Sequence, residues 1–282
     1  MKRRRILVFP CGSEVGLEIY RSLRYSRHFE LFGGNSVKDH GEFVFKKYIG
    51  DIPFIDDKKF IPECKRIIKA QKIDAIYPTM DKVVWKLKSF EKELGCIVIS
   101  SPEETTNICL SKNRTYERLK NVVNVPRIYK NIKHIKKYPV FVKPNIGYGS
   151  RRTFKANSID DLECFFLNNN YSDYLITEYL QGEEYTVDCF TDKKGDLRFC
   201  GPRIRQRISN GISVNTKSVS EDCSSFNGIA ESINNTLRMR GAWFFQVKRN
   251  NNRLFLLEIA SRLGGSSSLY RAQGVNFALL SI

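Results

Sequence analysis

Short apolar runs alternate with amphipathic stretches along the first hundred residues. Apolar runs typical of buried strands occupy residues 5–10, 29–34, 74–81 and 96–101. Helical spacing of apolar residues covers residues 11–26, 61–73 and 83–95, and Gly95 is placed to end the last helix. Strands separated by helices predict a parallel, doubly wound α/β sheet over residues 1–103.

Beyond residue 103 the pattern predicts an α+β domain, residues 104–282. Predicted helices cover residues 101–120, 158–170 and 226–241, with Ser101 and Ser158 as N-caps and Gly241 as the end of the third. Predicted strands cover residues 139–145, 174–192, where a short loop joins two strands, and 196–209. Residues 242–262 predict a hairpin with an Asn-rich turn, and residues 269–282 begin a helical region.

Composition narrows the class of protein. The 282 residues are 41% hydrophobic and 12% aromatic, which provides a core for two domains or one large one and excludes a disordered chain. No apolar run approaches the ~20 residues that span a bilayer. Eight cysteines occur singly, without a C-x-x-C pair, so we expect reduced thiols and a cytoplasmic protein.

The net charge of +17 predicts attraction for anions. These could be nucleotides, phosphorylated or carboxylate substrates, or nucleic acid, and a merely solvated lysine-rich surface has the same composition. The lysines are spread along the chain rather than gathered in one tail, which argues against nucleic acid.

One apolar strand ends on a lysine. Lys143 is followed by Pro144 and by a loop that contains Gly147, Gly149 and Ser150. Lysine is rarely buried without a partner, and glycine lets a backbone approach a ligand closely. A phosphate group is one candidate for that ligand.

The hairpin of residues 242–262 brings two oxygen donors together. Its short turn places Gln246 beside Glu258, and this pair suits Mg²⁺, which also binds nucleotide phosphates. An ion pair between Glu258 and Arg262, with Gln246 as an ordinary hydrogen-bonding residue, is the alternative.

Two further stretches have polar residues at strand ends. Residues 178–180 and Glu184 flank a turn at Gly182, where backbone groups could bind an adenine edge and the carboxylate a ribose, although many acidic hairpins look the same. The period of two predicts that Arg203, Arg205 and Arg207 share one face of a strand, either around an anion or facing solvent.

In this order and spacing, the motifs resemble those of the ATP-grasp superfamily. The similarity is greatest to the carbamoyl phosphate synthetase large subunit and related carboxylate–amine ligases, and residues 244–278 carry the best match. The resemblance covers residues 104–282 and implies an ATP-grasp domain with a lid subdomain at roughly residues 115–182. Residues 1–103 resemble the Rossmann-like pre-ATP-grasp domain that precedes it, with residues 74–81 as the sharpest local similarity.

The resemblance implies roles for individual residues. Lys112 and Lys143 would hold the ATP phosphates beneath the loop of Gly147, Gly149 and Ser150. Glu178, Tyr179 and Leu180 would bind adenine, and Glu184 the ribose. Gln246 and Glu258 would bind metal, whereas Arg262, with Lys143, would stabilise the transferring phosphoryl group. Arg203 and Arg205 are candidates for binding an anionic substrate.

The sequence departs from the superfamily in two places. Ala260 stands where an asparagine metal ligand is usual, so water, Ser261 or Ser266 would have to complete the second metal's shell, or activity would be reduced. The chain ends at Ile282 in an apolar segment where relatives continue, which leaves a short version and a truncated chain both open.

The expected function is that of an ATP-dependent carboxylate–amine ligase. It would form an acyl-phosphate, release ADP and phosphate, and use ATP with Mg²⁺ (or Mn²⁺) on small-molecule carboxylate and amine substrates, whose identity the sequence does not reveal. A catalytically weak or inactive ATP-binding protein is the alternative, and a nucleic-acid-binding protein is less favoured. A homodimer is compatible with the resemblance, and no membrane partner is expected.

Overall fold

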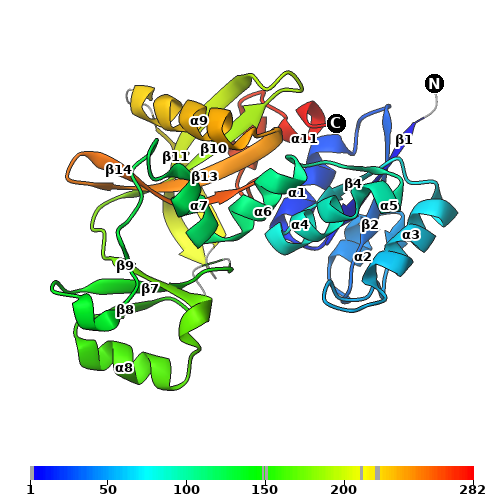
Figure 1. The fold of residues 1–282 in the computed structure, drawn as a ribbon. Helices are drawn as coiled ribbons and strands as arrows, with labels where there is room; N and C mark the ends of the chain where they lie inside the picture. Colours follow the sequence, from blue (N-terminus) through cyan, green and yellow to red (C-terminus); the bar gives the residue numbers. More distant parts are fainter. Residues whose placement is uncertain (1–2, 148, 150–151, 210–211, 220–222) are drawn as a thin grey trace.

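Three β-sheets organise the molecule (Figure 1). The computed structural model describes residues 3–147, 149, 152–209, 212–219 and 223–282. In the ribbon, the N-terminal sheet and its helices lie at the right, a large antiparallel sheet lies at the upper left, and a small sheet lies below the large one. Within the described residues, no helix is long and apolar enough to cross a membrane.

The first sheet is parallel and contains the strands predicted for the first hundred residues. Its order is β3-β2-β1-β4-β5, with β1 (Arg4–Phe9), β2 (Phe29–Gly34), β3 (Tyr48–Ile49), β4 (Ala75–Pro78) and β5 (Ile97–Val98). The helices between the strands are α1 (Glu14–Leu23), α2 (Gly41–Val44), α3 (Phe60–Gln71), α4 (Asp81–Ser89) and α5 (Glu91–Leu94). Gly95 ends α5 with a φ of 67°, as predicted, although the helix is interrupted at Phe90.

The large sheet is antiparallel and carries most of the second core. Its order is β12-β11-β10-β13-β14, with β10 (Glu184–Thr191), β11 (Leu197–Ser209), β12 (Ile212–Ser218), β13 (Gly241–Asn250) and β14 (Arg253–Ala260). Helices α6 (Glu103–Leu110), α7 (Lys112–Leu119) and α9 (Ser224–Leu237) pack against it. The predicted hairpin is confirmed, and it turns on Asn251 and Asn252, both with positive φ.

The small sheet forms a separate layer. Its order is β6-β9-β7-β8, with β6 (Ile128–Tyr129), β7 (Val140–Pro144), β8 (Phe154–Ala156) and β9 (Tyr174–Glu178). Helix α8 (Ile159–Leu167) covers its outer face, and Ser158 caps this helix as predicted. Two 3₁₀ turns, η1 (Ile132–His134) and η2 (Tyr171–Asp173), complete the layer.

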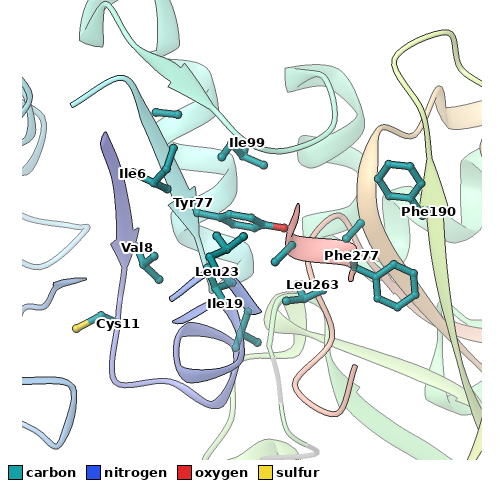
Figure 2. Close-up of a cluster of buried hydrophobic side chains, with 14 of the residues drawn as sticks. Ile6, Val8, Cys11, Ile19, Leu23, Tyr77, Ile99, Phe190, Leu263 and Phe277 are labelled. Atoms are coloured by element: carbon teal, nitrogen blue, oxygen red, sulfur yellow. The ribbon is translucent and has the colours of Figure 1, made fainter. Parts of the chain in front are cut away.

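The two ends of the chain share one hydrophobic cluster. Helices α10 (Ser268–Ala272) and α11 (Phe277–Leu280) pack beside the parallel sheet, so that Phe277 and Leu263 lie in the same cluster as Ile6 and Tyr77 (Figure 2). The carboxylate of Glu18, 2% exposed, accepts from the Arg271 guanidinium at 2.5 Å. The predicted boundary at residue 103 therefore lies between parts that are packed together, and it stays a prediction.

Three predicted helix ends are wrong. The helix of residues 101–120 is broken at Ser111, whose hydroxyl caps the second part by accepting from the Arg114 N–H. Ser101 is not an N-cap, because its hydroxyl is bonded to the backbone of Arg240. The helix of residues 226–241 ends before Arg238, which takes the left-handed conformation, and Gly241 already belongs to β13.

Candidate functional site

A cleft of about 870 Å³, open to solvent, lies between the small and the large sheet. Strands β7 and β9 contribute one wall, and β10, β13 and β14 contribute the other. Most of the residues predicted for a nucleotide site line this one cleft: Lys112, Lys143, Gly147, Gly149, Glu178, Tyr179, Leu180, Glu184, Arg205, Gln246 and Glu258.

Lys143 is buried at the end of β7, with 6% of its surface exposed. Its ammonium group donates to the Tyr116 hydroxyl at 2.5 Å and to the Leu257 carbonyl at 3.4 Å. The Tyr116 hydroxyl in turn donates to the same carbonyl at 2.6 Å. Both hydrogen-bond acceptors are neutral, so neither of them balances the charge of Lys143.

The environment of Lys143 lowers the pKa of its ammonium group to about 7. Burial is the largest cause, and repulsion from Lys112 acts in the same direction. The carboxylates of Glu258 and Glu184 act against this shift but do not outweigh it. The site therefore favours the charged lysine only when more negative charge arrives.

A β-bulge shapes the opposite wall. Gln246 pairs with Glu258 and Val247 pairs with Leu256, so Leu257 is the extra residue on β14. The bulge leaves the Leu257 carbonyl available to Tyr116 and Lys143. Through this carbonyl, Lys143 is hydrogen-bonded to β14, the strand that carries Glu258.

Gln246 and Glu258 are adjacent across the hairpin, as the sequence predicted. Lys112 lies 3.6 Å from the Glu258 carboxylate and donates to the Gly147 carbonyl at 3.2 Å. In the described part of the chain, no group of three or more His, Cys, Asp or Glu side chains could hold a metal alone. Two oxygen donors still fit Mg²⁺, because this ion usually keeps waters and takes phosphate oxygens as its other ligands.

Ala260, which stands at the position of the usual asparagine, provides no metal ligand. Ala260 is buried and pairs with Phe244. The Ser266 hydroxyl donates to the Ser213 carbonyl at 2.6 Å, and Ser261 is 4% exposed. None of these three residues lines the cleft.

The segment between β9 and β10 crosses from one sheet to the other. Glu178 accepts from the Arg127 backbone N–H at 2.9 Å, and the ring of Tyr179 lies 4.6 Å from the Lys155 ammonium. Gly182 takes a φ of 111°, where a Cβ would stand 2.0 Å from the Arg249 carbonyl. Only glycine fits this turn, which sets the spacing between Leu180 and Glu184.

The three arginines of β11 do not share one environment. The register of β11 shifts between Arg205 and Arg207, which breaks the predicted period of two. Arg205 lines the cleft and donates to Glu184 at 2.7 Å. Arg203 is 3% exposed and donates to Asp188 at 2.6 Å, so it forms a buried ion pair and does not line the cleft.

Arg262 also lies outside the cleft lining. It makes a bidentate ion pair with Asp81 at the start of α4, with both N···O distances 2.9 Å. The proposed alternative, an ion pair between Arg262 and Glu258, is therefore not what the structure contains. The loop glycines Gly147 and Gly149 are in the cleft wall, whereas Ser150 lies outside the described residues.

Sequence reasoning missed one residue that lines the cleft and one that lies buried behind Lys143. Lys248 lines the cleft two residues after Gln246 on β13, and the period of two could have identified it. Tyr116 lies one helical turn after Lys112 and beneath Lys143, and the i,i+4 spacing was its signal.

Residues 170–282 match a family model described as "ATP-grasp in the biosynthetic pathway with Ter operon". No curated protein matches the chain. The sequence resemblance to the ATP-grasp superfamily is confirmed, whereas the special similarity to carbamoyl phosphate synthetase stays a prediction.

Solved structures match almost the whole chain. Biotin carboxylase from Campylobacter jejuni, in a β,γ-ATP complex, gives a TM-score of 0.80 at 16% identity over 99% of this chain and 70% of that one. The biotin carboxylase domain dimer of 2-oxoglutarate carboxylase from Hydrogenobacter thermophilus, with MgADP and bicarbonate, gives 0.81 at 13% identity over 100% and 69%. L-amino acid ligase from Bacillus licheniformis gives 0.78 at 15% identity over 99% and 73%.

Proposed function

Starting from an ATP-grasp fold and a match to an ATP-grasp family, we propose that this chain is an ATP-dependent carboxylate–amine ligase. The observation that carries the proposal is the meeting of Lys112 and Lys143 with Gln246 and Glu258 in one cleft. Two cations and two oxygen donors on facing walls form a binding site suited to a metal-bound polyphosphate.

Each wall has a role in the proposed site. Lys143 and Lys112 bind the phosphates under the loop of Gly147 and Gly149, and Gln246 and Glu258 hold Mg²⁺ or Mn²⁺. The segment Glu178–Leu180 holds adenine, and Glu184 binds the ribose once Arg205 releases or shares its carboxylate. The small sheet is the lid, and the parallel sheet is the Rossmann-like pre-ATP-grasp domain.

The proposed reaction transfers the γ-phosphoryl group of ATP to a substrate carboxylate oxygen, which yields ADP and an acyl-phosphate. An amine then attacks the carbonyl carbon, phosphate leaves with the former carboxylate oxygen, and the amine loses a proton. The metal supplies charge neutralisation when bound. The protein aligns the reactants, and Lys143 counters the charge of the transferring group, joined by Arg262 once it leaves its ion pair with Asp81.

The neighbouring structures support the ligands and assembly of this proposal. One neighbour was solved with a β,γ-ATP complex, and another with MgADP, as a dimer. We therefore propose small-molecule substrates, a homodimer and a cytoplasmic location, the last supported by cysteines that form no disulfide. An ATP-binding protein without catalysis is the second candidate, and Ala260 is the observation that favours it.

A hydroxylamine trap tests the ligase proposal without knowledge of the amine. Hydroxylamine converts an acyl-phosphate into a hydroxamate, so the protein is incubated with Mg-ATP, hydroxylamine and a panel of carboxylates. The expected result is ADP and hydroxamate in equal amounts with at least one carboxylate. Saturable ATP binding by calorimetry with no ADP from any carboxylate would instead support the non-catalytic candidate.

The lowered pKa of Lys143 predicts that nucleotide binding takes up a proton. At pH 8 most of the Lys143 side chains are neutral when the cleft is empty, because their pKa is about 7, and a triphosphate restores the charge. Above pH 7, affinity for ATP is expected to fall by up to about tenfold per pH unit. Calorimetry at pH 8 in two buffers of different ionisation enthalpy should report uptake approaching one proton.

The lowered pKa of Lys143 also determines how the stability of the fold changes with pH. The unfolded chain binds more protons than the folded one between pH 7 and the ordinary lysine value of 10.5, so this group makes stability rise with pH there. Lys143→Met should remove both the proton uptake and this slope. Equal heats in the two buffers for the unaltered protein would contradict the prediction.

A further inference from the structure

A second hollow lies outside the proposed nucleotide site, between the first turn of α7 and strands β6 and β9. Its empty volume, including open solvent, is about 660 Å³. Asn113 and Asn145 line one end, and Tyr129, Lys130 and Ile176 line the floor and side. None of these residues lines the first cleft.

The segment that contributes Asn113, Tyr129 and Lys130 to this hollow is rich in exposed cations. All lysines and arginines from residue 113 to residue 137 are exposed: Arg114, Arg118, Lys120, Arg127, Lys130, Lys133, Lys136 and Lys137. Glu117 is the one acidic residue in this stretch, and Lys120 neutralises it at 2.6 Å. The attraction of Lys130 helps to lower the pKa of Glu117, which places that lysine close to α7.

Helix geometry sets the extent of the basic surface. Asn113, which lines the hollow, and Glu117 are four residues apart and share a face of α7, and Arg114 and Arg118 form the adjacent stripe. On the far side, Asp160 and Glu163 of α8 are acidic residues close enough to help raise the pKa of Tyr138, so the cations beyond η1 have carboxylates in their neighbourhood. Asp173 of η2 is an exposed carboxylate that lies in the sequence between two residues of the hollow, Ser172 and Tyr174. We define the basic groove as the hollow residues Asn113, Tyr129 and Lys130 together with the exposed arginines next to them on α7 and before β6, which are Arg114, Arg118 and Arg127.

We infer that the basic groove binds an extended, acidic polypeptide segment. The cations supply charge complementarity, and β6 is the edge strand of its sheet within the described residues, where an extended chain can dock. An acidic partner would account for part of the net charge of +17 that the nucleotide site leaves unexplained.

The tyrosine rings argue for a peptide rather than a single-stranded nucleic acid. Bases bind on free aromatic faces. Tyr171 packs against Phe166 and donates its hydroxyl to the Lys130 carbonyl, and Tyr174 packs against Phe165 and donates to Asn169. Tyr174 packs against the core of the small layer, whereas Tyr171 is 41% exposed at its edge. Each ring already has an aromatic neighbour and a hydrogen-bonded hydroxyl, which makes both poorer stacking platforms than free rings.

Fluorescence anisotropy tests this inference with a labelled octapeptide of alternating Glu and Gly. The full chain is used with a saturating non-hydrolysable ATP analogue and Mg²⁺, so that the first cleft is filled. We expect saturable binding that weakens as salt increases. The triple variant Arg114→Glu, Arg118→Glu and Lys130→Glu should weaken it by about tenfold or more, since several charge contacts are lost.

A matched control separates the groove from net charge. Lys46→Glu, Lys58→Glu and Lys69→Glu change three exposed cations on the N-terminal part and alter the net charge equally. This variant should change the affinity by less than about twofold if binding is local. If charge reversal impairs folding, the neutral set Arg114→Gln, Arg118→Gln and Lys130→Gln replaces it.

Three outcomes would overturn the inference. These are no saturable peptide binding at low salt, equal losses in the groove and control variants, and tighter binding of an oligo-dT of similar length with the same dependence on the groove. The last outcome would assign the groove to nucleic acid. None of them depends on whether the chain is a ligase, because the assay measures no turnover.

Discussion

Glu258→Gln is expected to remove the effect of Mg²⁺ on ATP binding and to reduce ADP formation by about a hundredfold or more. Glu258 is the only charged member of the Gln246–Glu258 pair, and its carboxylate lies 3.6 Å from the Lys112 ammonium. The amide oxygen that replaces it carries no charge to hold a divalent ion. Calorimetry with and without Mg²⁺ measures the first effect, and the hydroxylamine assay measures the second.

The charges of the cleft give this variant a distinctive signature. Loss of the Glu258 charge leaves Lys112 without its ion pair and takes away one group that raises the pKa of Lys143. The first effect strengthens the binding of metal-free ATP and the second weakens it, so the signature of the variant is its response to the metal: Mg-ATP should bind no better than ATP alone. Glu117→Gln, which alters an exposed carboxylate on α7, serves as the control and should change neither quantity. An unchanged response to Mg²⁺ in Glu258→Gln would show that the metal site is elsewhere.

Asp188→Ala is expected to destabilise the fold by about 3–5 kcal/mol, because it leaves the Arg203 guanidinium buried without its charge partner. Both side chains of this pair are at most 4% exposed, and the N···O distance is 2.6 Å. For a chain of this size we expect a fall in melting temperature of about 10 °C. Differential scanning calorimetry measures the change.

A double replacement distinguishes the buried charge from the lost contact. In Asp188→Leu with Arg203→Met, no charge is left in the core, so most of the stability should return. Arg205→Met, which breaks the more exposed pair with Glu184, should have a smaller effect on stability. If Asp188→Ala melts within about 2 °C of the unaltered protein, the pair contributes little to the fold.

The sequence predicts the strands and the site better than the ends of helices. Lys143, Gln246 and Glu258 could be identified because each interrupts an apolar strand with a polar group that needs a partner. The break at Ser111 was missed because a capping serine inside a helical pattern resembles a surface position. Its consequence is local, since Lys112 still begins a helix that faces the cleft.

Long-range ion pairs could not be predicted from the sequence. The local pattern offered Glu258 as the partner of Arg262, four residues away, yet Asp81 is the partner from 181 residues away. In the same way, the period of two placed Arg203, Arg205 and Arg207 together, but a register shift separates Arg207 from the other two, and Arg203 and Arg205 have different carboxylate partners. Spacing identifies residues that could meet on one element, whereas tertiary packing selects the partner.

The cluster that joins the two ends of the chain affects how the protein is made. Glu18 and Arg271 are 253 residues apart, and Phe277 packs in the same cluster as Ile6. During synthesis, the apolar side chains that β1 and α1 contribute to this cluster therefore stay partly uncovered until residues 263–278 have been made. Contacts between residues so far apart in the sequence favour slow completion of folding, and until they form, apolar surface is exposed to chaperones.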